Sequence, residues 1–213
     1  NINFNQMKVH ILISHLSSAD EGKNNYNNVQ NKKFKQAINH KINAKFNSLS
    51  NSMGLILGEN YHYDLVRPGI SLYGGHFDTK MKKIIKPVIS LKGKVLQIKE
   101  ISKNEFVGYN QTYKTNKKIK VAVLGIGYAD GISRLLSNKG NVYFKNQTFG
   151  IVGRVSMDTI TIDITKSSKS IKVGEYMEFI NHLHGIDKMA KQCNTICDEI
   201  LTSISDRVKR IYI

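Results

Sequence analysis

The sequence contains few cysteines and no long apolar segment. Its only cysteines among 213 residues are Cys193 and Cys197, too few for a disulfide framework. No apolar stretch approaches the ~18–20 residues that cross a bilayer. The first residues also lack the charged-then-apolar pattern of a secretory signal. We therefore expect a cytoplasmic chain with no membrane partner.

Acidic residues are scarce as well. The sequence has 16 Asp and Glu against 32 Lys and Arg, a formal net charge of +16. A basic surface can bind nucleic-acid phosphates, but only five of these cations are Arg, the main reader of base edges. No Arg cluster with interleaved aromatic residues is visible. We favour a solvated Lys- and Asn-rich surface with no nucleic-acid partner, and a polyanion-binding module is the alternative.

The first third of the chain alternates strand and helix patterns. An apolar run at 8–14 predicts a buried strand, and apolar residues at helical spacing predict a helix over 24–43. A short apolar segment at 53–57 precedes a further strand and turn in 64–75. This order indicates an α/β barrel or a layered sheet.

After Gly75 the pattern changes to β-branched and alternating segments. These predict a mostly antiparallel β domain with strands at 86–101, 118–128, 141–146, 148–155, 159–165 and 175–180. Two helices are expected within it, at 187–193 and 196–204, the second with Asn194 or Thr195 as its N-cap. Lys-rich sequence at 76–87 suggests the boundary, so we expect domains at 1–80 and 81–213.

Glycine is paired with polar residues where several apolar runs end. The clusters are VRPGI (66–70), VGY (107–109), GYADG (127–131) and GRVSMD (153–158). Glycine lets the backbone turn sharply or approach a ligand closely, and the active sites of parallel sheets lie at strand ends. Any one cluster alone is weak evidence, because strand–turn junctions commonly use Gly and Asp.

Taken together and in order, the motifs resemble those of alanine racemase, the pyridoxal 5'-phosphate (PLP) enzyme that interconverts L- and D-alanine. The matching segments are SHLSSADE (14–21), Asn51-Ser52, DLVRPGISLYG (64–74), VGYNQTY (107–113), GIGYADGISR (125–134), GRVSMD (153–158) and EIL…RVKRIY (199–212). The resemblance implies an α/β plus β fold, in which the remainder of a TIM-like barrel is followed by a β-rich C-terminal domain.

One family motif is missing. The resemblance places the PLP Schiff-base lysine near the start of the barrel, in a lysine–alanine–asparagine–alanine–tyrosine type motif that this sequence does not contain. A full barrel takes ~250 residues, whereas about 75 precede the β pattern here. The chain is therefore expected to be the C-terminal portion of a racemase and to be inactive alone. The alternative is an inactive relic or accessory subunit that keeps the dimer interface.

The resemblance assigns the acid/base chemistry to a tyrosine opposite the lysine. Racemisation needs one proton-transfer group on each face of the alanine α-carbon, and Tyr109 matches the family tyrosine. His15 and Arg67 match residues beside the cofactor ring. Arg67 matches the arginine at the pyridine nitrogen, which it cannot readily protonate, so the electron sink is weakened and transamination disfavoured.

The remaining family positions concern the phosphate, the substrate and the entrance. Ser52, Gly69 and Ile70 match the phosphate-binding positions. Met157 and Asp158 match the substrate-binding segment, and Tyr128 and Arg154 match entryway residues. Some relatives have a tyrosine at a further phosphate position, where this chain has Asp206, which we leave out of the site.

The resemblance also implies partners and a role. Family members are dimers in which the β domain of one subunit completes the barrel site of the other, so a homodimer or a complementing barrel fragment is expected, with alanine as substrate. The role implied is D-alanine supply for peptidoglycan of the cell wall. We expect no metal site: Cys193 and Cys197 are interpreted as buried apolar residues. His182 and His184 are expected to face solvent.

Overall fold

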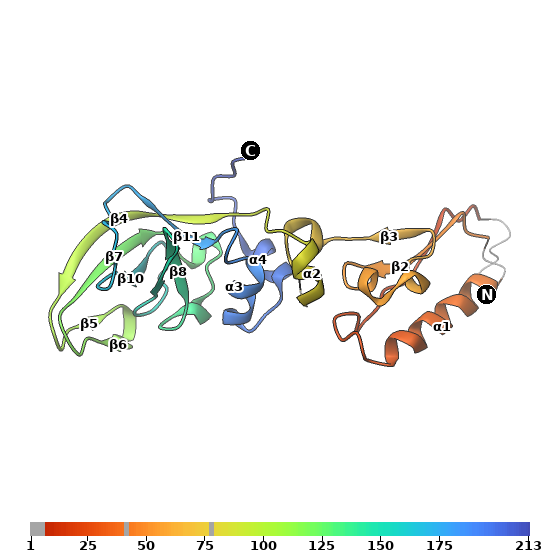
Figure 1. Cartoon of the computed structure of the whole chain (residues 1–213), viewed down its shortest axis with the longest axis horizontal. Coiled ribbons are helices and arrows are strands. Elements are labelled where there is room, and N and C mark those ends of the chain that lie inside the picture. The colour runs from red at the N-terminus through yellow and green to blue at the C-terminus, as the bar shows by residue number, and fades with distance from the viewer. Residues whose placement is uncertain (1–6, 41–42, 77–78) are drawn as a thin grey trace. The chain divides into compact units, whose positions relative to one another are not determined.

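The computed structural model describes residues 7–40, 43–76 and 79–213. The chain divides into two compact units, residues 1–86 and 87–213 (Figure 1). The end of the helix expected over 24–43 and part of the boundary segment expected at 76–87 lie outside the described residues. Within the described ranges, no helix combines the length and apolar character needed to span a bilayer.

The first unit is built on a three-stranded parallel sheet. Its strands run in the order β1 (Ile11–Ile13), β2 (Phe46–Asn51) and β3 (Leu65–Arg67). Helix α1 (Tyr26–Asn39) connects β1 to β2 and so forms a strand–helix–strand unit (Figure 1). The short helices that follow are η2 (Gly54–Leu57), η3 (Glu59–Tyr61), η4 (Ile70–Tyr73) and α2 (Thr79–Ile84).

In two elements of this unit, the buried positions differ from those that the apolar pattern of the sequence predicts. Strand β2 is polar in sequence, yet Leu49 within it is fully buried. On α1 the buried positions are Phe34 and two asparagines, Asn27 and Asn31. Asn27 Nδ2 donates to the carbonyl of Ser18 at 3.0 Å, so a loop satisfies the amide N–H donor of this buried side chain. Hydrophobic periodicity therefore located α1 but could not identify β2.

The second unit is a mainly antiparallel sheet in the order β10-β7-β4-β11-β8-β9. An isolated antiparallel bridge between Ile151 and Ile162 brings the segment after β9 back toward β10 and nearly closes the sheet. This confirms the expected β-rich architecture. The strands are β4 (Leu91–Ile101), β7 (Ile119–Gly125), β8 (Asn141–Phe144), β9 (Gln147–Gly150), β10 (Ile160–Asp163) and β11 (Tyr176–Ile180).

Short elements decorate this sheet. They are β5 (Phe106–Val107), η5 (Tyr109–Gln111), β6 (Tyr113–Lys114), η6 (Tyr128–Asp130), η7 (Arg134–Leu136), α3 (Ile186–Cys193) and α4 (Cys197–Ser203). The expected N-cap of α4 was wrong. Ile196 occupies that position, whereas Asn194 ends α3 in a left-handed conformation, φ 53°. Both cysteines are buried as expected, and burial raises the pKa of the Cys193 thiol.

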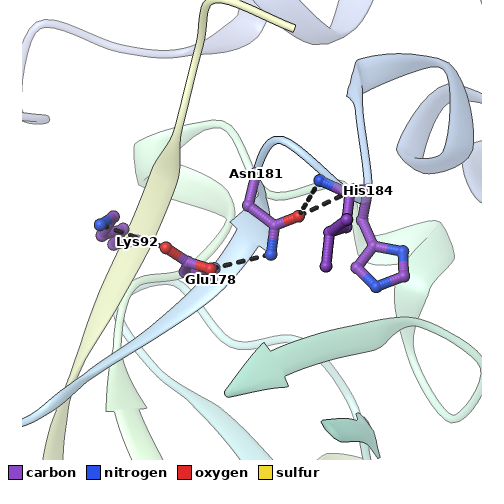
Figure 2. A network of polar contacts seen from close by, with 5 residues as sticks. Lys92, Glu178, Asn181 and His184 are labelled. Carbon is purple, nitrogen blue, oxygen red and sulfur yellow. Dashed lines mark hydrogen bonds and ion pairs between the residues drawn. The ribbon is translucent and has the colours of Figure 1, made fainter. Parts of the chain in front are cut away.

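A polar network connects β4 with the turn that follows β11. Lys92 forms an ion pair with Glu178 at 3.1 Å, and Glu178 accepts a hydrogen bond from Asn181 Nδ2 at 2.8 Å (Figure 2). Asn181 Oδ1 in turn accepts the backbone N–H of His184 at 2.8 Å. The imidazole of His184 stacks on the ring of Tyr143 with a centroid distance of 3.6 Å. The expectation that His184 faces solvent was wrong, because the turn directs its ring onto the sheet.

Candidate functional site

Polar side chains follow all three parallel strands of the first unit at their carboxyl ends. His15 lies two residues after β1, Asn51 is the last residue of β2 with Ser52 directly after it, and Arg67 is the last residue of β3. Because the strands are parallel, these ends meet at one edge of the sheet. Parallel α/β sheets bind their ligands at this edge.

Arg67 is fixed by contacts with β2 and with the segment that follows β1. Its Nη1 donates to Ser48 Oγ at 2.5 Å and its Nη2 donates to the carbonyl oxygen of Ser14 at 2.7 Å. The Ser48 hydroxyl in turn donates to the carbonyl oxygen of Leu65 at 2.8 Å. These contacts hold a permanently charged group in one orientation at the strand ends.

His15 lies between Arg67 and Asn51. Its Nδ1 is 3.5 Å from Arg67 Nη2, and its Nε2 is 3.2 Å from Asn51 Nδ2. A neutral imidazole accepts at one nitrogen and donates at the other, so it can accept from only one of these two donors. Asn51 Oδ1 also accepts the N–H of Gly54 at 2.9 Å, which fixes the turn after β2.

Ser52 faces the backbone that follows β3. Its hydroxyl oxygen accepts the N–H of Gly69 at 2.9 Å and is 3.4 Å from the N of Ser71. Ile70 between them is buried, and Gly75 packs so closely on it that an added Cβ would lie 2.5 Å from Ile70 Cγ1. Ser71 Oγ is buried without a hydrogen-bond partner among the described residues. Hydroxyls, backbone N–H groups and a guanidinium together suit an anionic ligand.

In the second unit, the segment that carries Tyr109 packs against the segment that carries Arg154. Gly108 has φ 77°, and an added Cβ there would lie 2.9 Å from the backbone N of Arg154. Gly153 has φ 80°, and its Cβ would lie 2.7 Å from the carbonyl oxygen of Val107. Only glycine fits both the positive φ and the close contact. Tyr109 is left 67% exposed beside this contact, so its phenol is accessible.

Asn138 reinforces this contact from a third segment. Its Oδ1 accepts the N–H of Gly153 at 2.6 Å, and its Nδ2 donates to Thr112 Oγ1 at 3.2 Å. The residue therefore bridges the loop after Tyr109 and the loop before Arg154. Sequence reasoning missed Asn138. Its backbone is left-handed, with φ 60°, and the sequence indicates this conformation only through the presence of an Asn in a turn.

Met157 and Asp158 lie against the turn formed by GYADG (127–131). The N–H of Tyr128 donates to the carbonyl of Ser156 at 2.9 Å, and the N–H of Ala129 donates to the carbonyl of Met157 at 3.0 Å. The turn itself is closed by Asp130 Oδ2, which accepts the N–H of Gly127 at 2.8 Å. Met157 and Asp158 remain exposed, so they can meet a ligand.

The entryway residues differ in their surroundings. Tyr128 is exposed, with the guanidinium of Arg134 6.0 Å from its ring centroid. Arg154 is partly buried, and its Nε has no hydrogen-bond partner within the residues the structure describes. Asp206 points outward, fully exposed, and pairs with Arg210 at 3.3 Å. Each predicted site residue thus lies in one of two clusters, one at the strand ends of the first unit and one in the loops of the second.

The fold and these clusters define a class of protein. It is an α/β plus β protein with a group of hydroxyl, backbone N–H and guanidinium donors at the ends of parallel strands and a second group of exposed polar residues on an antiparallel β unit. Two family models match the chain, "Alanine racemase, N-terminal domain" over residues 2–76 and "Alanine racemase, C-terminal domain" over residues 88–212.

Individual alanine racemases are similar to almost the whole of this chain. The chain is 37% identical to an alanine racemase from Brucella abortus, over 98% of this chain and 56% of the relative. It is 39% identical to one from Rickettsia bellii, over 97% of this chain and 50% of the relative. A crystal structure of alanine racemase from Bartonella henselae with covalently bound pyridoxal phosphate superposes with a TM-score of 0.91 at 38% identity, covering 99% of this chain and 58% of that one.

The chain belongs to the alanine racemase family. It spans about half the length of the curated relatives that it matches.

Proposed function

We propose that this chain is the C-terminal part of a PLP-dependent alanine racemase. The observation that carries the proposal is the convergence of His15, Ser52 and Arg67 at the carboxyl ends of three parallel strands. Domain assignments follow from the same proposal: residues 1–80 are the end of the barrel and residues 81–213 are the C-terminal β domain.

The residues at the strand ends fit the cofactor. Pyridoxal 5'-phosphate, when bound, supplies the electron sink that stabilises negative charge at the alanine α-carbon. The Ser52 hydroxyl and the N–H groups of Gly69 and Ile70 would hold the phosphate, and the unpartnered buried hydroxyl of Ser71 leaves one more donor in the same backbone segment. Arg67, fixed by Ser14 and Ser48, would donate to the pyridine nitrogen and keep it unprotonated.

The loops of the second unit supply proton transfer and substrate recognition in this proposal. Tyr109 would remove or return the α-proton on one face, for which its exposed phenol is accessible. Met157 would donate its backbone N–H to the substrate carboxylate, with Asp158 beside it. Tyr128 and Arg154 would line the entrance.

The complete enzyme requires more chain than these residues. We propose that a barrel segment with the Schiff-base lysine, from the same gene or a neighbouring one, completes the site, and that two copies combine as a homodimer. The enzyme would act in the cytoplasm and supply D-alanine for peptidoglycan. The alternative is an inactive relic or accessory subunit that keeps only the interface.

Complementation of a D-alanine auxotroph tests the proposal. The chain is co-expressed with the N-terminal barrel segment of a relative that contains the lysine motif, and each part is also expressed alone. Growth without D-alanine is expected only for the combination. A stable complex without growth or racemase activity would support the accessory or relic alternative instead.

A further inference from the structure

Arg207 contacts both of the loops that form the substrate-binding segment of the second unit. Its Nη2 donates to Asp158 Oδ1 at 2.6 Å, and its Nε is 3.4 Å from Asp130 Oδ1. Asp130 closes the turn that carries Tyr128, whereas Asp158 follows Met157. One guanidinium therefore connects two carboxylates from separate loops.

The C-terminal segment that carries Arg207 is itself held against this turn. The N–H of Ser205 donates to the carbonyl of Asp130 at 3.4 Å, and Ser203 Oγ donates to the carbonyl of Gly131 at 3.3 Å. An added Cβ at Gly131 would lie 2.5 Å from the carbonyl oxygen of Ser203, so the two backbones touch. The backbone just before Arg207 is therefore held in place against the turn, which limits where its side chain can reach.

The charge on Asp158 bears on substrate binding. A carboxylate next to the Met157 N–H would repel the carboxylate of an amino acid bound there. The guanidinium of Arg207, 2.6 Å from that carboxylate, offsets its charge. Because the Arg207 and Asp158 side chains are 53% and 58% exposed, their pair contributes little to overall stability. The contact therefore matters for the local geometry and charge of the loop.

We propose that Arg207 is a positioning residue that fixes the Met157–Asp158 segment against the 127–131 turn and neutralises Asp158, so that the Met157 N–H can receive a substrate carboxylate. The role in substrate binding rests on the proposed racemase function, whereas the positioning of the loop by Arg207 does not depend on it.

Amide hydrogen exchange in the isolated full chain tests the geometry. In Arg207→Gln, the N–H groups of Tyr128 and Ala129, which donate to the Met157 loop, should exchange about two- to fivefold faster. In Arg207→Lys, the exchange rates of these two N–H groups should lie between those of Arg207→Gln and those of the parent chain. The matched control is Arg210→Gln, because within the described part of the chain Arg210 pairs only with Asp206 and the carbonyl of Ile204. Unchanged exchange at both amides in Arg207→Gln, or equal acceleration in Arg210→Gln, would overturn the proposal.

Kinetics of the enzyme completed with the missing barrel segment test the charge. Arg207→Gln should raise KM for alanine about three- to tenfold with little change in kcat, because the unpaired carboxylate repels the substrate. Adding Asp158→Asn should return KM toward the parent value. If KM rises in Arg207→Gln and Asp158→Asn does not reverse the rise, Arg207 does not act by neutralising Asp158. If the parental combination has no activity, the proposed function fails, and the exchange experiment still decides the role of Arg207.

Discussion

The backbone of Gly127 lies directly against Met157. A Cβ added at Gly127 would be 2.2 Å from the carbonyl oxygen of Met157 and 2.4 Å from that of Ser156. The φ of Gly127 is −151°, which any residue adopts, so the contact alone demands glycine. The turn can therefore donate its N–H groups to the Met157 loop only because no side chain intervenes.

We expect Gly127→Ala to displace the Met157 loop. The clash is with backbone atoms that cannot rotate away, so the free energy of unfolding of the second unit should fall by about 1–3 kcal/mol. Chemical denaturation of the chain measures this change. Gly150→Ala is the control, because a Cβ there meets nothing within 4 Å. Equal stability of both variants would show that the Met157 loop adapts freely.

The sequence was informative where residues are constrained by their neighbours in the chain. The antiparallel strands and the glycine clusters were identified because alternation and Gly-polar pairs are local signals. Strand β2 was not, because its buried Leu49 lies among polar residues. Nor were Asn138 and Arg207, whose contacts are with residues at least 15 positions away, Gly153 and Asp158 among them. Such long-range polar contacts leave no pattern in a single sequence.

His184 is expected to make the second unit less stable in acid. Burial, followed by the charges of Lys188 and His182, lowers the pKa of His184 from its usual value, although Glu178 partly opposes this shift. The folded state therefore favours the neutral imidazole, which stacks on Tyr143. The unfolded chain binds the proton at higher pH, so stability is lost as the pH falls below about 6.5.

Denaturation of the second unit between pH 8 and 5 measures this loss. His184→Phe keeps a ring against Tyr143 without a titrating group and should flatten the pH dependence. His182→Gln is the control, because His182 is exposed and affects His184 only through its charge. A pH dependence that persists in His184→Phe would assign the loss to another group.

The first unit should be less protected than the second when the chain is studied alone. Strands β1 and β3 form the two edges of the described parallel sheet, and Ile11, Ile13 and Val66 on them are 42%, 55% and 40% exposed. Uncovered apolar side chains and unpaired edges reduce local stability. Hydrogen exchange should be fast over residues 1–75 and slow in the strands after about residue 85. Uniformly slow exchange along the chain would contradict this.

The chain alone should form no specific lysine adduct with the cofactor. None of its lysines lies in the family motif, although 27 are present. Incubation with pyridoxal 5'-phosphate and borohydride, followed by peptide mass spectrometry, should give scattered substoichiometric labelling of surface lysines and no racemisation. A single lysine labelled in full, together with turnover, would show that this chain holds its own catalytic lysine.

In the proposed enzyme, assembled by supplying a barrel segment with the family lysine, Tyr109→Phe should impair one direction of proton transfer more than the other. The substitution keeps the ring beside the Gly108–Arg154 contact and removes only the phenol group, so cofactor content should be unchanged. Abstraction of the L-alanine α-proton should suffer most, by about 10²–10⁴-fold for loss of an acid/base group. Exchange of the D-alanine α-proton with solvent should partly persist, because the lysine serves that face in the family.

Deuterium incorporation into each enantiomer, measured separately in heavy water, distinguishes the two faces. Tyr113→Phe is a suitable control, because Tyr113 lies on β6 of the same small ribbon and its phenol is assigned no role in proton transfer. That variant should exchange both enantiomers at the parental rates. If Tyr109→Phe slows both half-reactions equally while the cofactor content stays normal, Tyr109 is not the base for a single face, and another residue must carry the proton of L-alanine.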